Sequence, residues 1–537
     1  MCNISKPGEM RSLYLFLIYI ASFLFLLPRL DGFDYFYGKY LWAEDGVIFL
    51  NDSQEIGYKS LFKPYAGYLH FYPRLVALVA TGLDLLYRPV VLLVGWLLAY
   101  GVLIYAIARA AIAMNFSLLS IITLIGLVSL QPNNGEVFFN ITNSQWMLGA
   151  ALSVYAITTD GGSLARKAGV CLMLVGMGLT GPFCIVLAPV LMVKAIARRD
   201  WRYNSHVYIP VILSAIIQST VLLNSNRVSQ GLVDDSLLDW VMASMLMLSF
   251  GSGKALVLLA VFCFWSLVFY SLIKRLRHDR GYASILTPFL LFITAVLFII
   301  AGLISSKQNP LAIVAIGAGG NRYSWVPYTL IYISVMMITL ESRIINLFII
   351  LLSSIVCAKN FNKVSSPSLQ FGSYANFSRF REVNIPINPQ WPTYPGWHIN
   401  GVPTGLLDRL AGNEIGIDSE SMEVIGARYK FKDGAVLIDS TSVDSQVVLR
   451  DKVQCLGALD IGVEIRLTRD SEGWLQSFWS EDGSFAEKNS IRRWYPSGAV
   501  VAQFAFPSSE HGVHFRFDPM EVVGYGSIEN IDIYCLH

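Results

Sequence analysis

The sequence of 537 residues carries little charge. Asp, Glu, Lys and Arg make up only 15% of it, against about 25% in ordinary globular domains. Hydrophobic residues account for 54%, and the basic residues stand between apolar runs and form no patch. This composition excludes a soluble enzyme, a nucleic-acid binder and a disordered scaffold, although the length alone would suggest about three or four soluble domains.

Cysteine is also scarce. The chain has seven cysteines and no Cys-x-x-Cys pair, which excludes a disulfide-built scaffold. Cys455 and Cys535 fall in the polar last third and are a candidate disulfide, provided that this part faces an oxidising compartment. Four others lie in apolar runs, where we expect them to pack as small hydrophobic residues: Cys171, Cys184, Cys263 and Cys357.

The charge that is present is unevenly distributed along the chain. Residues 361–537 hold 15 Lys and Arg and 22 Asp and Glu, whereas residues 1–360 hold the other 25 basic and 16 acidic residues. The sparsely charged first part is predicted to be a membrane domain. A Ser-, Pro- and Asn-rich linker is predicted at 361–390, followed by a water-soluble domain at 391–537.

The soluble part has the pattern of a β-sandwich. Short runs of alternating apolar and polar residues, such as 513–517 and 528–534, are separated by the turn signals Asp433-Gly434 and Asp482-Gly483. Alternation at this spacing is typical of the short strands of two packed antiparallel sheets.

Apolar runs dominate the first part. Some have the roughly 17–25 residues that a helix needs to cross the bilayer core, and the others are slightly shorter. The first run follows Lys6 and Arg11 and is interpreted as a retained anchor. Residues 72–88 and 239–250 are predicted to lie along the membrane interface. About eleven membrane helices are predicted, near 12–28, 89–108, 116–132, 144–159, 168–181, 182–197, 206–223, 255–273, 283–304, 325–340 and 343–358.

The basic residues predict the orientation of these helices. With the N-terminus in the cytoplasm, every second connection carries the Lys and Arg excess, as the positive-inside rule requires. An odd number of spans then places residues 361–537 outside, where the Cys455–Cys535 disulfide can form. Membrane lipids are therefore expected partners and nucleic acid is not. The basic connections contain Arg109, Arg166, Lys167, Lys194, Arg198, Arg199, Arg202, Lys274, Arg275, Arg277, Arg280 and Arg343.

An acidic pair, Glu44-Asp45, lies in the first predicted outer loop, between Trp42-Ala43 and Gly46. Adjacent carboxylates beside a membrane should raise the pKa of one of them, which suits a general base that removes a proton from a hydroxyl group. The alternative is an ordinary solvated turn before an interfacial helix. No obligatory metal is predicted, because no His, Cys and Asp cluster has ligand spacing; a divalent cation at the acidic pair stays an open alternative.

Two arginines of the outer loops are candidate phosphate ligands. His70 and Arg74 are four residues apart and would share one face of a helix, where they would bind a phosphate or a hydroxyl group, or else anchor the helix at the interface. Arg322 follows two glycines and precedes Tyr323. Its guanidinium suits two-pronged phosphate binding, and an interface anchor is the alternative.

The second outer loop carries polar residues that suit a sugar. Glu136, Asn140 and Asn143 have the i, i+4, i+7 spacing of one helical face, with Gln145 and Trp146 directly after them. Such side chains would bind sugar hydroxyls, and the indole would stack on a sugar ring. The alternative is that the asparagines cap a helix and satisfy the loop backbone.

This arrangement resembles the GT-C superfamily, the polytopic glycosyltransferases that use lipid-phosphate-linked sugars. Over most of residues 1–358 it has that superfamily's order: a first span, a long outer loop with an acidic motif, a second span that ends at Ile107-Ala108-Arg109, and a third that ends at Gln131-Pro132. Trp42-Ala-Glu-Asp-Gly is most similar to bacterial members, including the phage-type glucosyltransferases that modify O-antigen. The order Glu-Asp departs from the Asp-Glu of protein mannosyltransferases.

The resemblance implies an enzyme of the bacterial inner membrane with its C-terminal domain in the periplasm or outside the cell. It would transfer a sugar from a polyprenyl-phosphate donor to an O-antigen or lipopolysaccharide acceptor, with inversion, and Asp45 or Glu44 would occupy the position of the base, Asp45 being the first choice. The rival hypotheses are a flippase of lipid-linked oligosaccharides, an O-antigen polymerase or ligase, and a non-catalytic glycan-binding protein. A flippase would be expected to have charged residues within its spans and internal repeats. The sequence has almost no charged residues within the predicted spans and no evident repeat.

Overall fold

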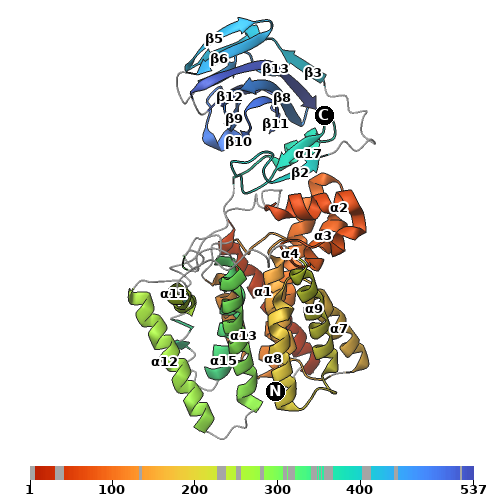
Figure 1. Cartoon of the computed structure of the whole chain (residues 1–537), viewed down its shortest axis with the longest axis vertical. Coiled ribbons are helices and arrows are strands. Elements are labelled where there is room, and N and C mark those ends of the chain that lie inside the picture. The colour runs from red at the N-terminus through yellow and green to blue at the C-terminus, as the bar shows by residue number, and fades with distance from the viewer. Residues whose placement is uncertain are drawn as a thin grey trace, which may run out of the picture. The chain divides into compact units, whose positions relative to one another are not determined.

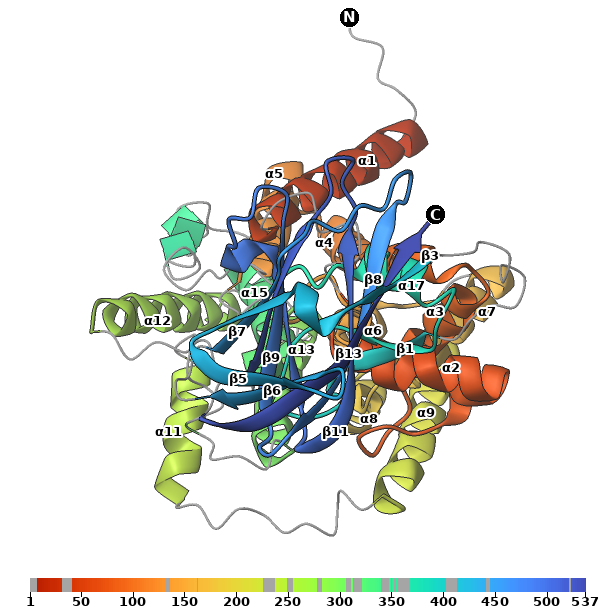
Figure 2. The same ribbon diagram turned by 90° about the horizontal axis from the view of Figure 1, so that it is seen from above.

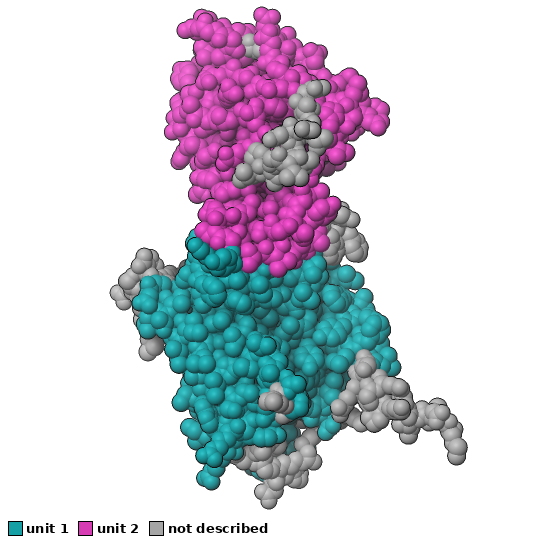
Figure 3. Space-filling model, turned by 90° about the vertical axis from the view of Figure 1, so that its right-hand side faces the viewer, with its two compact units in different colours: residues 1–33, 58–76, 92–365 teal, residues 34–57, 77–91, 366–537 magenta. Residues whose placement is uncertain are grey.

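The computed structural model divides the chain into two compact units, which are coloured separately in Figure 3. The first unit consists of residues 1–33, 58–76 and 92–365, and the second of residues 34–57, 77–91 and 366–537. The second unit therefore includes two stretches of the predicted continuous membrane domain. The structure describes residues 7–30, 41–131, 136–161, 163–225, 237–248, 255–277, 283–305, 311, 321–339, 347–348, 350–351, 354–355, 367–401, 413–440, 445–520 and 523–537.

Helices form at the predicted apolar stretches as far as 325–340, and most of the last stretch, 343–358, lies outside the described residues. Figure 1 shows α8 and α13 side by side along a common direction. The helices of this part of the chain, with α11 outside the predicted spans, are α1 (Pro7–Leu26), α4 (Arg88–Ala113), α5 (Leu118–Leu130), α6 (Ser144–Thr158), α7 (Leu164–Gly178), α8 (Phe183–Arg198), α9 (Ser205–Leu223), α11 (Leu237–Leu248), α12 (Ala255–Arg277), α13 (Ala283–Ser305) and α15 (Trp325–Thr339).

Within the described residues, four helices are long and apolar enough to cross a membrane: Leu85–Ala113, Ser205–Leu223, Leu258–Arg277 and Ile285–Ser305. The α12 helix lies at the edge of the helical unit in both views (Figures 1 and 2). Its outward side chains Leu259, Phe262 and Phe269 are exposed, and an apolar surface of this kind is stable in lipid and not in water. The first unit has the helices of a membrane protein.

The centre of the helical unit is formed by α6 and α15. Nearly every side chain of both helices is buried, as expected for helices that are apolar on all sides. Gly149 allows a close approach between helices, because a Cβ atom there would lie 2.5 Å from the ring of Phe183 at the start of α8.

Residues 72–88 do not form a span of their own. They contain α3 (Phe71–Thr81) and the short η5 (Leu85–Tyr87), and α4 begins at Arg88. Of the stretch 239–250, residues 239–248 fall in α11, whose Ala243 and Met247 pack against α13, and residues 249–250 lie outside the described residues. The acidic motif leads into the π-helix η3 (Asp45–Leu50), followed by α2 (Asn51–Ile56) and η4 (Gly57–Phe62).

The second unit contains two antiparallel sheets that pack face to face, as the sequence predicts. The strand orders are β10-β9-β12-β7-β4 and β11-β8-β13-β6-β5, and β3 also pairs with β13. The ring centroids of Trp479 in one sheet and Phe506 in the other are 5.0 Å apart. The strands are β3 (Asn413–Ile417), β4 (Met422–Ile425), β5 (Ala427–Lys432), β6 (Ala435–Ser440), β7 (Ser445–Leu449), β8 (Asp460–Arg469), β9 (Gly473–Ser480), β10 (Ser490–Tyr495), β11 (Gly498–Pro507), β12 (His514–Met520) and β13 (Gly524–Leu536).

The predicted disulfide is present in this sandwich. It joins Cys455, in the loop after β7, to Cys535 near the end of β13, with the two Cα atoms 5.3 Å apart. Closing a loop of this length restricts the unfolded chain and stabilises the fold by about 2–4 kcal/mol.

Residues 361–390, predicted above to be a linker, are folded where the structure describes them. They contain α17 (Phe371–Phe377) and β1 (Val383–Pro386), and β1 pairs with β2 (His398–Gly401). Phe371, Tyr374 and Phe377 are buried, so α17 packs through one apolar face. The Ser and Asn content that suggested a linker has another use: Ser373 Oγ and Asn376 Nδ2 donate hydrogen bonds to the carboxylate of Asp460, at 2.5 and 2.6 Å.

Candidate functional site

Several of the predicted substrate-binding residues meet in the first unit. Arg322, at the start of α15, forms an ion pair with the carboxylate of Glu136. The Arg322 guanidinium also lies 5.6 Å from the centroid of the Tyr323 ring. That ring packs edge-on against Trp146, at the start of α6, with centroids 5.4 Å apart. Two segments separated by more than 170 residues in sequence thus form one polar and aromatic cluster, which we call the Arg322 cluster.

The Glu136–Arg322 pair is asymmetric in its exposure. The Glu136 side chain is 10% exposed, whereas the Arg322 side chain is 35% exposed. The carboxylate holds the guanidinium in place, and about a third of the Arg322 side chain is exposed. Arginine presents five N–H donors in a planar fork, a geometry that matches phosphate and carboxylate oxygens.

The loop at 136–143 is not the helix that the spacing predicts, because α6 begins only at Ser144. Phe139 has φ +61°, a left-handed conformation that reverses the chain. Asn140 Nδ2 and Asn143 Nδ2 both donate to the carbonyl oxygen of Glu136, at 2.7 and 2.9 Å. The asparagine amides therefore satisfy the loop backbone, which is the alternative stated above, and we do not assign them to a sugar.

This loop in turn fixes Trp146. The indole Nε1 donates to Asn143 Oδ1 at 2.9 Å, and the ring packs edge-on against Phe183, with centroids 5.3 Å apart. A left-handed non-glycine residue such as Phe139 costs about 1–3 kcal/mol and persists only when its surroundings determine it. Here those surroundings position a carboxylate and an indole.

Gln145 adjoins a second buried turn. A Cβ atom on Gly181, which has φ +87°, would lie 3.0 Å from Gln145 Oε1. Gln218, a polar residue within the apolar run of α9, joins this turn to the segment before α3. Its Oε1 accepts from the backbone N–H of Leu69 at 2.9 Å, and its Nε2 donates to the carbonyl oxygens of Leu69 and Gly181, each at 3.1 Å. The sequence analysis missed Gln218, although a lone glutamine in an apolar run was a usable signal.

His70 and Arg74 do not share a helical face, because α3 begins after His70. His70 forms a β-bridge with Thr180 and stacks on Tyr68, with ring centroids 4.5 Å apart. His70 and Arg74 are both buried, which is incompatible with interface anchors that contact lipid headgroups. Beside them, burial raises the pKa of Tyr72 to about 12, so its hydroxyl stays protonated and donates to the carbonyl oxygen of Gly95 at 2.6 Å.

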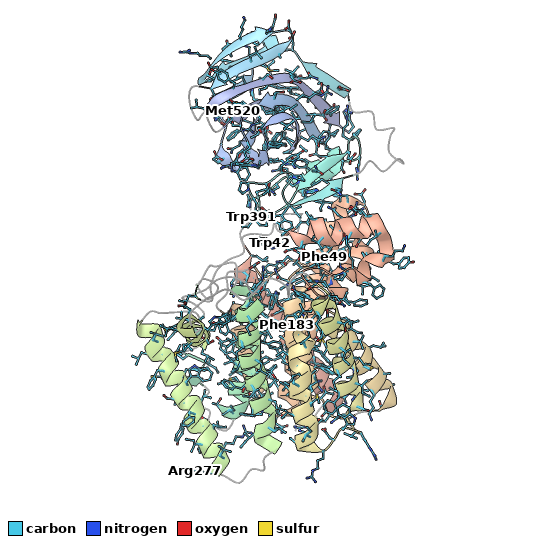
Figure 4. The ribbon with its side chains drawn as sticks, in the orientation of Figure 1. Trp42, Phe49, Phe183, Arg277, Trp391 and Met520 are labelled. Atoms are coloured by element: carbon cyan, nitrogen blue, oxygen red, sulfur yellow. A yellow bond between two sulfur atoms is a disulfide. The ribbon has the colours of Figure 1, made fainter. Side chains whose placement is uncertain are left out.

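The acidic pair lies in the second unit. Asp45 is the first residue of the π-helix η3 and is fully buried, whereas Glu44 is partly exposed. Asp45 Oδ2 accepts a hydrogen bond from the backbone N–H of Trp42 at 3.1 Å. Ala43, between them, has φ +34°. Left-handed residues and π-helical turns both concentrate at functional sites, and Figure 4 labels Trp42 and Phe49 on either side of the pair.

Arg29 is a further buried residue that the sequence analysis missed. It lies at the end of η1 (Leu27–Arg29) and is completely buried. Its guanidinium donates to the carbonyl oxygens of Ser129 and Gln131, at 3.4 and 2.5 Å, and lies 4.5 Å from the centroid of the Phe138 ring. Arg29 therefore links the first helix to the end of α5 and to the loop of the Arg322 cluster.

Three predicted cytoplasmic connections converge in the first unit. Arg109 of α4 donates to the hydroxyls of Thr158 and Thr159 at the end of α6, at 2.9 and 2.6 Å. Lys194 of α8 donates to the carbonyl oxygens of Ala156 and Thr159, at 3.2 and 3.1 Å. Figure 4 shows Phe183 and the basic Arg277 towards opposite ends of the helices. The basic ends of α4 and α8 therefore meet the end of α6.

Among the residues that the structure describes, no group of three or more His, Cys, Asp and Glu side chains could hold a metal ion. The pair Glu44-Asp45 supplies two carboxylates that could contribute to a metal site.

No protein-family model matches the sequence, and no curated protein matches it. The C-terminal β-sheet domain is similar to solved carbohydrate-binding modules. One is the C-terminal module of a marine laminarinase from Zobellia galactanivorans (13% identity, 23% of this chain, 99% of that chain, TM-score 0.19). Another is a low-affinity xylan-binding module from Roseburia intestinalis (12% identity, 24% of this chain, 97% of that chain, TM-score 0.19). A third is a module from Piromyces equi (9% identity, 24% of this chain, 91% of that chain, TM-score 0.18).

Proposed function

We propose that this protein is an integral membrane glycosyltransferase with a GT-C-like helical domain of about eleven spans. It transfers a sugar from a polyprenyl-phosphate donor to a cell-surface glycan of the O-antigen or lipopolysaccharide type. The reaction takes place on the outer face of the bacterial inner membrane, and the C-terminal domain lies on that same side. The lipid-linked sugar is a substrate, and no obligatory cofactor is assigned.

The observation that carries the proposal is the Arg322 cluster. A guanidinium held on one side by Glu136 and partly exposed on the other suits the phosphate of a lipid-linked donor. Tyr323, beside it, is partly exposed and offers aromatic surface to a sugar ring, and the buried Trp146 packs against the Tyr323 ring. The cluster lies at the starts of the apolar helices α6 and α15, where a donor anchored in the bilayer by its lipid presents its polar head.

The base is assigned to Asp45, with Glu44 as the alternative. Asp45 is the buried member of the pair, and its Oδ2 is oriented by the hydrogen bond from the Trp42 N–H. A buried carboxylate with a fixed orientation suits a general base that accepts a proton. The fixed backbone on both sides restricts the directions in which it can do so.

The transfer is a single displacement. The oxygen of an acceptor hydroxyl forms a bond to the anomeric carbon of the donor as the bond from that carbon to the phosphate oxygen breaks. The hydroxyl proton passes to Asp45 or Glu44, and polyprenyl phosphate leaves with the electron pair. Arg322, together with Arg74, balances the charge that develops on the phosphate, and attack from the opposite side inverts the anomeric centre.

The test uses the purified full-length protein with a radiolabelled polyprenyl-phosphate monosaccharide and a glycan acceptor. The wild type is expected to transfer label, and Asp45→Asn is expected to abolish transfer while Glu44→Gln reduces it. Full transfer by both variants would contradict the assigned chemistry. Flipping of a lipid-linked oligosaccharide without use of a monosaccharide donor would support a flippase in its place, and joining of preformed oligosaccharides would support a polymerase or ligase.

A further inference from the structure

The second unit contains a contact between two segments that are about 340 residues apart in sequence. The acidic motif runs alongside the chain that follows β1. The backbone N–H of Asn388 donates to the carbonyl oxygen of Leu41 at 3.2 Å, and the N–H of Ala43 donates to the carbonyl oxygen of Asn388 at 2.5 Å. Trp42 and Asn388 are thereby paired as in a parallel sheet.

This pairing acts directly on the carboxylate of Asp45. Trp42, the paired residue, is also the one whose N–H donates to Asp45 Oδ2. Ala43 enters its left-handed conformation immediately after the pairing. The backbone position of Asn388 therefore sets the direction of the hydrogen bond that the carboxylate accepts.

A second contact fixes the residue after Asp45. A Cβ atom on Gly46 would lie 2.6 Å from Cδ1 of Ile387 and 2.8 Å from Cγ1 of Ile399, so this backbone is pressed against β2 and the residue after β1. Both isoleucines are buried. Five residues beyond the end of the motif at Gly46, Asn51 Oδ1 accepts from the backbone N–H of Asn400 in β2 at 3.0 Å.

The β1–β2 ribbon is itself attached to the sandwich. Gln503 of β11 donates to the carbonyl oxygen of Glu382 at 3.1 Å, and Arg381 donates to the hydroxyl of Tyr534 in β13 at 2.9 Å. The α17 helix, just before the ribbon, is held by Asp460 of β8 as described above. A continuous series of contacts therefore runs from the sandwich through the ribbon to the acidic motif.

From these contacts we infer that the ribbon at 383–401 is a positioning element for Asp45. The C-terminal part of the chain thereby acts on the rate of the transfer step, and its role is not confined to holding a glycan. This inference rests on the proposed function, because it concerns the residue assigned there as the base.

The test variant is Gly46→Ala, which places a methyl group where Ile387 and Ile399 already lie. We expect kcat to fall by roughly 100-fold, because a catalytic group displaced by about 1 Å loses that much rate, while KM for donor and acceptor stays within about twofold. The pH–rate profile should change as well, because the hydrogen bond from the Trp42 N–H to the Asp45 carboxylate is altered. Adding Ile387→Val, which removes the nearest atom, should restore part of kcat.

The matched control is Gly416→Ala in β3, where a new Cβ atom would meet nothing within 4 Å; it should behave as wild type. Gel filtration and limited proteolysis show whether Gly46→Ala folds. If it does not, Asn51→Ala tests the inference in its place, and we expect kcat to fall by about threefold to tenfold at unchanged KM.

A folded Gly46→Ala variant with normal kcat and pH profile, or with a change confined to KM, would overturn the inference. Where Gly46→Ala does not fold, an Asn51→Ala variant with normal kcat would overturn it. Failure of the proposed function has a different signature, because Asp45→Asn and Glu44→Gln would then both retain full transfer.

Discussion

The two units differ in one kind of acceptor that they offer to basic side chains, the C-terminal end of a helix. In the helical unit, Arg29, Lys194 and Arg275 donate to backbone carbonyl oxygens at the C-terminal ends of α5, α6 and α15, and Asp160 also pairs with Lys194 and Arg198. In the second unit, Arg379 pairs with Asp84 and Arg516 with Asp518, and Arg469 donates to the carbonyl oxygen of Gly473, the first residue of β9. Acids are scarce in residues 1–360, which supply most of the helical unit and have 25 basic and 16 acidic residues.

A helix end is a suitable partner for a cation where acids are rare. Its last four carbonyl oxygens have no partner within the helix, and the helix dipole makes that end negative. Arg322 has the carboxylate of Glu136 as a partner. Arg198 of α8 also pairs with a carboxylate, that of Asp160, but it belongs to a predicted cytoplasmic connection. We therefore assign Arg322, the carboxylate-held arginine of the predicted outer loops, to a substrate anion.

The largest expected effect tests the assignment of Arg322 to a substrate anion. Arg322→Ala should lower kcat by about 100- to 1,000-fold, as the loss of one group that stabilises transition-state charge typically does. Glu136→Gln should cost less, since the guanidinium itself remains and the amide oxygen of Gln can still accept a hydrogen bond from it. The measurement is the rate of sugar transfer by purified variants from a labelled polyprenyl-phosphate donor.

Reversing the charges of the Glu136–Arg322 pair distinguishes a role of Arg322 in substrate binding from a purely structural role. Glu136→Arg combined with Arg322→Glu keeps opposite charges together and should recover the thermal stability of the wild type without recovering transfer. If transfer also returns in the reversed pair, Arg322 serves only to hold the loop at 136–143, and the phosphate assignment is wrong.

The next largest effect concerns stability in the helical unit. Arg29→Met should lower the free energy of unfolding by about 3 kcal/mol, because hydrogen bonds to a charged group contribute about 1.5–3 kcal/mol each and the carbonyl oxygens of Ser129 and Gln131 would lose a buried donor. Thermal unfolding in detergent measures the loss. A shift no larger than that of a surface variant would show that water or lipid replaces the guanidinium at this helix end.

The corresponding change in the second unit should matter far less. The Arg379–Asp84 pair, at 3.1 Å, joins side chains that are 28% and 38% exposed, and exposed pairs of this kind contribute about 0.2–1 kcal/mol. Arg379→Met should therefore lower stability by about 0.5 kcal/mol, and less at high salt because the pair is screened. A loss as large as that of Arg29→Met would remove the contrast between the two units.

Local patterns in the sequence predicted much of this molecule. Apolar runs located the helices, alternation located the sandwich, and the polar residues at 136–146 and 322–323 proved to be neighbours. The predicted geometry of 136–143 was wrong, because spacing alone cannot reveal that Phe139 adopts a left-handed conformation and that the asparagine amides bind the Glu136 carbonyl oxygen.

Long-range contacts were beyond what these patterns contain. The pairing of Trp42 with Asn388 involves one residue on each side and leaves no periodicity, so the segment at 361–390 had only the composition of a linker. Arg29 had the position of an ordinary charged flank after an apolar run, and its burial depends on where α5 ends. In each case the missing information is which helix end or loop packs beside a residue, and a single sequence does not encode that in its spacing.

The smallest expected effect concerns an exposed carboxylate of the sandwich, in the turn after β9. Hydrogen bonds from the Ser484 and Ser480 hydroxyls and from the Ser484 N–H hold the pKa of Asp482 below its usual range. A lowered folded-state pKa stabilises the fold above the unfolded value of about 3.9, and this contribution is lost as the pH falls through the folded pKa. Asp482→Asn should therefore unfold at a slightly lower temperature than wild type at pH 7, and the two midpoints should converge in acid. Asp433→Asn, in the other Asp-Gly turn, is the control, and a difference that stays constant from pH 7 into acid would assign the Asp482 effect to turn geometry and not to charge.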